Sequence, residues 1–168
     1  MSEKSVGTLV IDDLNPGKHL YLFSTETGLA PFLSIIRDPE TYERFEKIVL
    51  VHGVRVVSEL AYQEYLTKEL PNDEFLGELV RNQLIYYPTV TREAYSHTGR
   101  LTTAIESGKL FTDIGLPQLN PAVDRAMICG SPAMLKETSE LLDQRGFKVS
   151  PSSGELGDYV FERAFVEK

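Results

Sequence analysis

Short apolar runs alternate with helical patterns along the chain. Residues 47–52 form the clearest run, β-branched and without in-and-out alternation, which is typical of a strand covered on both faces. Strands are predicted over 19–24, 47–52, 84–90 and 125–129, with late or edge strands at 148–150 and 159–166. This order predicts an α/β fold, a doubly wound and mostly parallel sheet with helices on both faces.

Helical patterns fill the segments between these strands. The strongest begins with Ser58 as the expected N-cap, ends at Pro71, and aligns Tyr62, Tyr65, Leu66 and Leu70 on one face. Further helices are expected over 28–37, over 73–83, from Leu101 to Gly108, and from about Pro132 to Gly146. The last has an inward face made of Met134, Leu135, Thr138, Leu141 and Leu142.

Composition and charge narrow the possible functions. The 168 residues suit one domain, with 1–18 expected as a leader and 19–168 as the domain itself. A net charge of −8, from 17 Lys+Arg against 25 Asp+Glu, disfavours binding to nucleic acid or to an anionic membrane. No apolar stretch approaches the roughly 18 residues that span a bilayer, and no secretory signal is visible, so we expect a cytoplasmic protein.

The sequence gives little support for metal or thiol chemistry. His19, His52 and His97 are scattered without the spacing of metal ligands, so no metal site is expected. Cys129 is the single cysteine, which excludes an internal disulfide. As a nucleophile it would need a base, and no histidine is visibly placed for that role, so taken alone it reads as a small buried residue.

The segments after the strands have the composition of an anion site. Ligands of such sheets bind beyond the carboxyl ends of the strands. The turn after the first strand leads into a helix N-terminus and suits a phosphate, although an ordinary helix-entry turn is equally consistent with it. Arg55, Arg92 and Arg100 leave the same sheet edge, and guanidinium groups suit bidentate phosphate contacts; the alternative is three solvated arginines. Gly130 lets a ligand approach the backbone closely.

The segments that follow the strands, together with the end of the chain, resemble the corresponding segments of the bacterial ferredoxin–NADP(+) reductases. The matching motifs are Thr25-x-Thr27-Gly28-Leu29-Ala30-Pro31-Phe32, His52-Gly-Val-Arg55, Thr91-Arg92-Glu93, Thr98-Gly99-Arg100, Cys129-Gly130-x-x-x-Met134 and Glu162-Arg-Ala-Phe-Val-Glu-Lys168. They occur in the family's order from about Gly7 to the end. The resemblance implies a Rossmann-like NADP(H)-binding domain of an oxidoreductase. In the family an N-terminal barrel holds FAD, and its Arg-x-Tyr-Ser stretch has no counterpart here. The resemblance therefore implies that residues 1–18 are a remnant of the link to that barrel, and that 19–168 form the NADP(H)-binding domain with a C-terminal tail that faces the flavin.

The resemblance also implies a role for each matching residue. Arg55, Arg92 and Arg100, with Thr91, match positions that hold the 2′-phosphate end of NADP(H), which implies a preference for the phosphorylated cofactor. The turn from Thr25 to Pro31 matches the one that holds the pyrophosphate and the nicotinamide ribose. The other cofactor-binding candidates in these motifs are Thr27, Gly28, Ala30, Gly130 and Met134.

Candidate catalytic residues are Thr27, Cys129 and Glu162. The first two match residues beside the nicotinamide, and Glu162 matches a carboxylate near the flavin that handles protons or positions the ring. Ala164 and Phe165 match residues that pack and stack on FAD. The electron partner implied for the whole enzyme is ferredoxin or flavodoxin.

Two positions depart from the family pattern. Glu26 stands where the Thr-Gly-Thr-Gly turn has its first glycine, so a collision with the pyrophosphate and charge repulsion are expected to weaken binding. Ser152 stands where bacterial relatives often have arginine.

Two other functions fit the same residues. One is an isolated, non-catalytic dinucleotide-binding module, and the other is the NADP domain of a different flavin-dependent reductase. Without the FAD domain the isolated chain is expected to be inactive. Phe161, Phe165 and Val166 would then leave an apolar patch exposed, which favours self-association.

Overall fold

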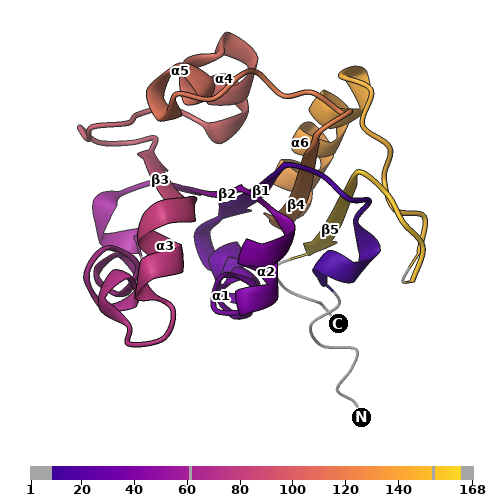
Figure 1. The fold of residues 1–168 in the computed structure, drawn as a ribbon. Helices are drawn as coiled ribbons and strands as arrows, with labels where there is room; N and C mark the ends of the chain where they lie inside the picture. The colour runs from indigo at the N-terminus through magenta and orange to yellow at the C-terminus, as the bar shows by residue number, and fades with distance from the viewer. Residues whose placement is uncertain (1–8, 61, 153, 164–168) are drawn as a thin grey trace.

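A five-stranded parallel sheet forms the centre of the protein, whose computed structural model describes residues 9–60, 62–152 and 154–163 (Figure 1). The strand order is β3-β2-β1-β4-β5, and each neighbouring pair is parallel. The strands are β1 His19–Thr25, β2 Lys47–Val54, β3 Leu84–Val90, β4 Asp124–Gly130 and β5 Tyr159–Arg163. The predicted fold class is therefore confirmed. Pro88 lies in an edge strand, where its missing N–H is tolerated.

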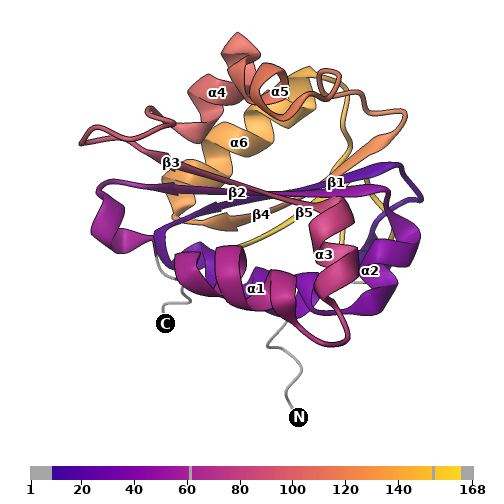
Figure 2. The ribbon, with the colours of Figure 1, turned by 60° about the vertical axis from the view of Figure 1, so that its left-hand side comes forward.

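Helices cover both faces of the sheet. Figure 2 shows α1, α2 and α3 below it and α4, α5 and α6 above it. Their bounds are α1 Ala30–Ile36, α2 Pro39–Arg44, α3 Gly77–Gln83, α4 Leu101–Ser107, α5 Lys109–Ile114 and α6 Pro132–Gln144. The predicted inward face of α6 is buried as expected, while α2 and α5 were not anticipated as separate helices. No helix in the described ranges is long and apolar enough to cross a bilayer.

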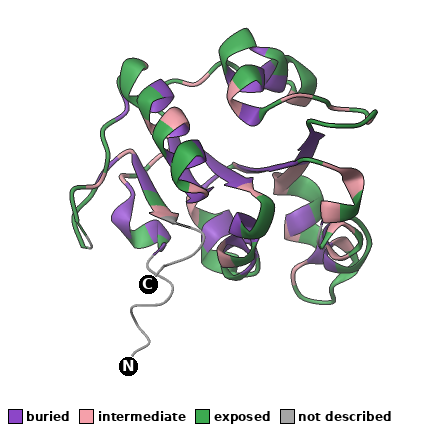
Figure 3. Ribbon diagram, turned by 180° about the vertical axis from the view of Figure 1, so that it is seen from behind, coloured by how far each residue is buried: buried purple, intermediate pink, exposed green. Residues whose placement is uncertain are grey.

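Burial explains why β1 lacks a polar face. Leu20 and Leu22 pack into the core on the α1–α3 side, whereas Tyr21 and Phe23 pack into the core on the α4–α6 side. Because side chains alternate between the two faces and both faces are covered, the run is apolar throughout. Figure 3 shows the buried sheet between helices whose outer surfaces are exposed.

The helix predicted from Ser58 to Pro71 is only partly present: residues 63–72 are helical, whereas the described residues before Gln63 do not continue that helix. This stretch contains a 3-10 turn at Val57–Glu59, a π-helical turn at Tyr65–Glu69 and a second 3-10 turn at Leu70–Asn72. Tyr62 has φ of 69°, a left-handed conformation that a regular helix cannot contain. Its side chain is exposed, so it does not belong to the buried stripe.

The late strands are only partly as predicted. Residues 148–150 make a single bridge, between Val149 and Tyr159, where a strand was expected. The strand predicted over 159–166 is present over β5, and its last residues lie outside the described part of the chain.

The segment before β1 packs against the domain. Leu9, Ile11 and Leu14 are buried in the core on the α1–α3 side. The boundary between leader and domain at residue 18 stays a prediction, but residues 9–18 share the hydrophobic core of the domain.

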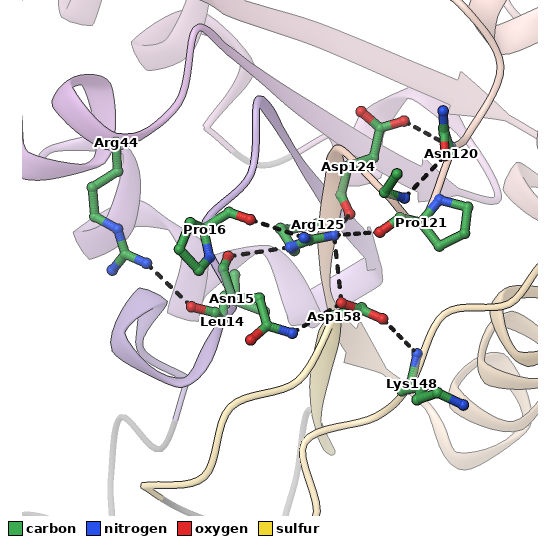
Figure 4. Close-up of polar contacts among 11 residues, drawn as sticks. Leu14, Asn15, Pro16, Arg44, Asn120, Pro121, Asp124, Arg125, Lys148 and Asp158 are labelled. Carbon is green, nitrogen blue, oxygen red and sulfur yellow. Dashed lines mark hydrogen bonds and ion pairs between the residues drawn. The ribbon is translucent and has the colours of Figure 1, made fainter.

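A buried arginine holds that segment in place (Figure 4). Arg125 donates from Nε to the carbonyl of Asn15 at 3.1 Å and from Nη2 to that of Pro16 at 2.8 Å. Its Nη1 donates to the carbonyl of Pro121 at 2.7 Å and lies 3.4 Å from the carboxylate of Asp158. The guanidinium thus joins three chain segments at the amino ends of β1 and β4.

The strand order places a functional site at the opposite end of the sheet. From β1 the chain moves outward to β2 and β3, and it then returns past β1 to β4 and β5. The order therefore reverses between β1 and β4. Ligands of open α/β sheets bind beyond the carboxyl ends of the strands at such a point.

Candidate functional site

A cavity of about 580 Å³ opens beyond the carboxyl ends of the strands. Its walls come from the segments after β1, β2 and β3 and from the first turns of α4 and α6. The lining residues are Thr25, Glu26, Gly53, Val54, Arg55, Thr91, Arg92, Gly99, Arg100, Leu101, Thr102, Ser131, Ala133, Met134 and Glu137. The cavity therefore lies where the topology alone would place a ligand.

Three arginines from three different segments meet at this cavity. Arg55 follows β2, Arg92 follows β3, and Arg100 occupies the N-cap position of α4. Backbone hydrogen bonds join the first two segments: the amide of Arg92 donates to the carbonyl of Arg55 at 2.8 Å, and that of Thr91 donates to the carbonyl of Val54 at 3.0 Å. The structure thus brings together the three cations that the sequence singled out.

Carboxylates compensate two of these arginines. Arg55 pairs with Glu59 at 2.8 Å and with Glu26 at 3.5 Å, and the hydrogen bond and charge of Glu59 are the main causes that raise its pKa. Arg100 pairs with Glu137, whose hydrogen bond likewise raises the pKa of the guanidinium. Within the described ranges Arg92 has no ion-pair partner. The site is therefore less basic than three arginines alone would make it.

The turn after β1 is tightly constrained. Glu26 has φ of 50°, a left-handed backbone that favours glycine, and its side chain lies in the cavity wall. The buried imidazole of His52 donates from Nε2 to the carbonyl of Glu26 at 2.8 Å, and burial lowers the pKa of His52. A Cβ on Gly28 would lie 2.2 Å from the carbonyl oxygen of Cys129, so this position requires glycine.

The ends of β1 and β4 meet through another glycine. A Cβ on Gly130 would lie 2.4 Å from Oγ1 of Thr25 and 2.8 Å from Sδ of Met134. Ser131 caps α6, because its Oγ accepts a hydrogen bond from the amide of Met134 at 3.3 Å. Thr25, Gly130 and Met134 therefore form one contact group on this side of the cavity, although Gly130 is not among the lining residues.

The three candidate catalytic residues lie outside the cavity wall. Thr27 is exposed in the turn, whereas Cys129 is fully buried. Burial, and secondarily the charge of Glu162, raises the pKa of the Cys129 thiol to about 12. Cys129 and Glu162 are register partners in β4 and β5, and Oε1 of Glu162 is buried without a hydrogen-bond partner among the described residues. The thiol is therefore neutral at physiological pH.

The remaining candidates lie at the start of α1 or beyond the described residues. Ala30 and Pro31 are the first residues of α1 and do not line the cavity. Ala164 and Phe165 lie outside the described part of the chain.

Several cavity residues were missed by the sequence reasoning. Gly53 directly follows His52, the predicted end of one strand, and Ser131 lies two residues after Cys129, the predicted end of another, so their position at a strand exit was an available signal. Thr102 and Ala133 belong to first helical turns. Glu137 had no comparable signal, because its contact with Arg100 joins residues from two different helical segments.

Comparisons with known proteins show which family the chain belongs to. Residues 22–140 match the family model of the oxidoreductase NAD-binding domain. A ferredoxin–NADP reductase of Azotobacter vinelandii is 65% identical over 168 residues, which is 100% of this chain and 65% of the relative. A flavodoxin/ferredoxin–NADP reductase of Escherichia coli is 34% identical, over 80% of this chain and 52% of the relative.

A solved structure agrees with these matches. The ferredoxin–NADP(+) reductase of Neisseria gonorrhoeae, with bound FAD and NADP, superposes with a TM-score of 0.79 and 27% identity, over 93% of this chain and 60% of that one. The chain thus spans less than two thirds of the length of these relatives. It belongs to the oxidoreductase NAD-binding domain family, and over its full length it matches ferredoxin–NADP reductases.

Proposed function

We propose that this chain is the NADP(H)-binding part of a ferredoxin or flavodoxin–NADP(+) reductase. The convergence of Arg55, Arg92 and Arg100 on one cavity beside the β1–β4 reversal is the observation that carries the proposal. A guanidinium cluster at the carboxyl ends of parallel strands suits a nucleotide with an additional phosphate. The relatives' names and the NADP bound to the Neisseria gonorrhoeae reductase support the same function.

Each part of the site has a proposed task. Thr91 and the three arginines hold the 2′-phosphate end, and the Thr25–Pro31 turn with Gly28 and Ala30 holds the pyrophosphate and the nicotinamide ribose. Met134 forms part of the wall against which the nucleotide lies, and Gly130 lets the nucleotide approach the backbone beside it. NADPH bound by these residues would supply a hydride to FAD, and the residues of this chain would contribute orientation and electrostatics.

Thr27, Cys129 and Glu162 are proposed to act next to the nicotinamide and the flavin. A thiol with a pKa of about 12 is a poor nucleophile, so the proposed task of Cys129 is packing beside the ring. Glu162 is proposed to position the flavin or handle its proton, and its buried oxygen is available for that purpose.

The rest of the enzyme is proposed to supply FAD and the docking surface for ferredoxin or flavodoxin. Ala164 and Phe165 would complete the flavin site. Phe161 is 49% exposed on β5, which is consistent with a surface that meets another domain. Self-association through that surface, and the cytoplasmic location, stay predictions.

Calorimetric titration of the chain with NADP(+) and with NAD(+) tests this function. We expect NADP(+) to bind more tightly, and Arg100→Ala to reduce that preference. Arg145→Ala is the matched control, because Arg145 follows α6 at its far end and does not line the cavity. Equal affinity for both nucleotides, or no effect of Arg100→Ala, would contradict the proposal.

A further inference from the structure

The loop from residue 91 to residue 100, which joins β3 to α4, forms one wall of the cavity. It supplies Thr91, Arg92, Gly99 and Arg100 to the lining. Its last residues fold back on the strand that it leaves. The amide of Val90 donates to the carbonyl of His97 at 3.0 Å, and the amide of Gly99 donates to the carbonyl of Val90 at 3.0 Å. The position of Gly99 and Arg100 therefore depends on how this return segment is attached to β3.

The side chain of His97 attaches that segment to β3 as well. Its ring stacks on Tyr87 with centroids 4.0 Å apart and an interplanar angle of 15°. Its Nδ1 lies 3.3 Å from the carbonyl oxygen of Pro88. Because a carbonyl oxygen only accepts hydrogen bonds, Nδ1 is the donor in this contact. His97 thus makes a stacking contact and a directed polar contact with two consecutive residues of β3.

A carboxylate from α5 completes the arrangement. Asp113 accepts a hydrogen bond from Oη of Tyr87 at 2.6 Å and pairs with Lys109 at 2.7 Å. These two bonds are the main causes that lower the pKa of Asp113, so the group is ionised. Nε2 of His97 lies 4.0 Å from the same carboxylate oxygen. Tyr87, His97 and Asp113, which we call the His97 anchor, thereby connect the loop, β3 and α5.

We infer that His97 is a positioning residue for cofactor preference: through the His97 anchor it sets where the return segment of the loop presents Gly99 and Arg100 to the nucleotide. None of the three anchor residues lines the cavity, so the effect passes through the loop backbone. This inference rests on the proposed function, since it assigns the phosphate-bearing end of NADP(H) to this loop. It adds a residue outside the arginine cluster to the determinants of selectivity.

Nucleotide selectivity separates positioning from a general contribution to folding. In His97→Ala, the affinity for NADP(+) should fall by roughly three- to tenfold, the range expected for loss of an aromatic pair, while the affinity for NAD(+) changes little. His97→Phe keeps the stacked ring and should restore most of the preference. Ser96→Ala, at an exposed neighbour on the same loop, is the matched control and should behave as the wild type.

Amide hydrogen exchange provides a second measurement that needs no nucleotide. The amides of Val90 and Gly99 should exchange faster in His97→Ala than in the wild type and return toward wild-type rates in His97→Phe. Unchanged exchange at both amides, or an equal loss of affinity for NADP(+) and NAD(+), would overturn the inference. If the wild type binds neither nucleotide, the proposed function fails and the inferred selectivity role fails with it. The exchange rates then still show whether His97 attaches the loop.

Discussion

Arginines occur at both ends of the sheet, with opposite surroundings. At the amino end the Arg125 side chain is 7% exposed and is surrounded by backbone carbonyls and Asp158 (Figure 4). At the carboxyl end Arg55 and Arg100 are 48% and 60% exposed and pair only with side-chain carboxylates among the described residues. One end thus buries its cation permanently, and the other keeps its cations accessible.

The difference shows how the same residue type takes two roles. Carbonyl groups of the backbone cannot move away without unfolding, so Arg125 is a fixed structural element. Surface carboxylates are held weakly and a stronger anion can replace them, because exposed ion pairs contribute only up to about 1 kcal/mol. Accessibility of the guanidinium and mobility of its partners, not the presence of arginine, therefore distinguish the binding end.

The largest effect is expected from Arg125→Ala. The change leaves Asp158 and several carbonyls without their donor, so the free energy of unfolding should fall by about 3 kcal/mol. Urea denaturation followed by circular dichroism measures this loss. The ratio of affinities for NADP(+) and NAD(+) should stay the same in the folded protein. If the free energy of unfolding fell by less than about 1 kcal/mol, Arg125 would contribute no more than an exposed ion pair does. The proposed difference between the two ends of the sheet would then be wrong.

Removal of single arginines at the carboxyl end should change binding without changing stability. Arg92 has no carboxylate to release among the described residues, so Arg92→Ala should weaken NADP(+) binding by roughly tenfold or more. Arg55→Ala should cost less, roughly threefold, because Arg55 must first leave Glu59 and Glu26. Calorimetric titration ranks the two losses of affinity. A larger loss for Arg55→Ala than for Arg92→Ala would show that the ion pairs of Arg55 with Glu59 and Glu26 do not compete with the ligand.

Substitution of Glu26 tests whether the cavity carries its own competing anion. In Glu26→Gly the left-handed backbone becomes unstrained, so the free energy of unfolding should rise by about 1 kcal/mol. The affinity for NADP(+) should rise severalfold, because Arg55 loses a competing carboxylate and the ligand loses a repelling one. Glu26→Gln removes the charge but keeps the backbone strain. If the glutamine variant binds no better than the wild type, repulsion is not the obstacle.

The smallest effect is expected from Glu137→Gln. Its exposed pair with Arg100 contributes little, so the free energy of unfolding should change by less than about 0.5 kcal/mol. Without this competing pair, the protein should bind NADP(+) about twofold more tightly. This gain corresponds to the contribution of one surface ion pair. Parallel titration of Lys136→Gln, a neighbour whose pair with Glu140 lies outside the cavity wall, provides the control. An equal gain in both variants would point to net charge and not to the local pair.

Local patterns predicted the strands and the exits from them. The apolar runs that became β1, β2 and β4 are buried on both faces, so their apolar composition follows from their surroundings. Once the strands are parallel, their carboxyl ends share one edge, and the arginines that come after two of them must approach each other. The candidate phosphate site was predictable for that reason.

The stretch from residue 57 to residue 72 shows where local patterns fail. Its apolar spacing favours a helix, but Leu60 is buried against Val54 and Val90, and Tyr62 turns left-handed instead of continuing a helix. Packing against the ends of two strands thus overrides helical propensity. Periodicity indicates which residues are buried, but it does not indicate which part of the protein they pack against.

The sequence by itself determined the strands β1 to β4, the parallel sheet with helices on both faces and the set of cations after its strands, because these depend on local periodicity and on connection rules. Only the tertiary structure decided which carboxylates face those cations, that burial beside Glu162 raises the pKa of the Cys129 thiol, and that His97 attaches the arginine-bearing loop to β3. The physical reason is distance along the chain. Glu137 contacts Arg100 across 37 positions, and the charge, exposure and pKa of a side chain are set by neighbours that only folding brings together.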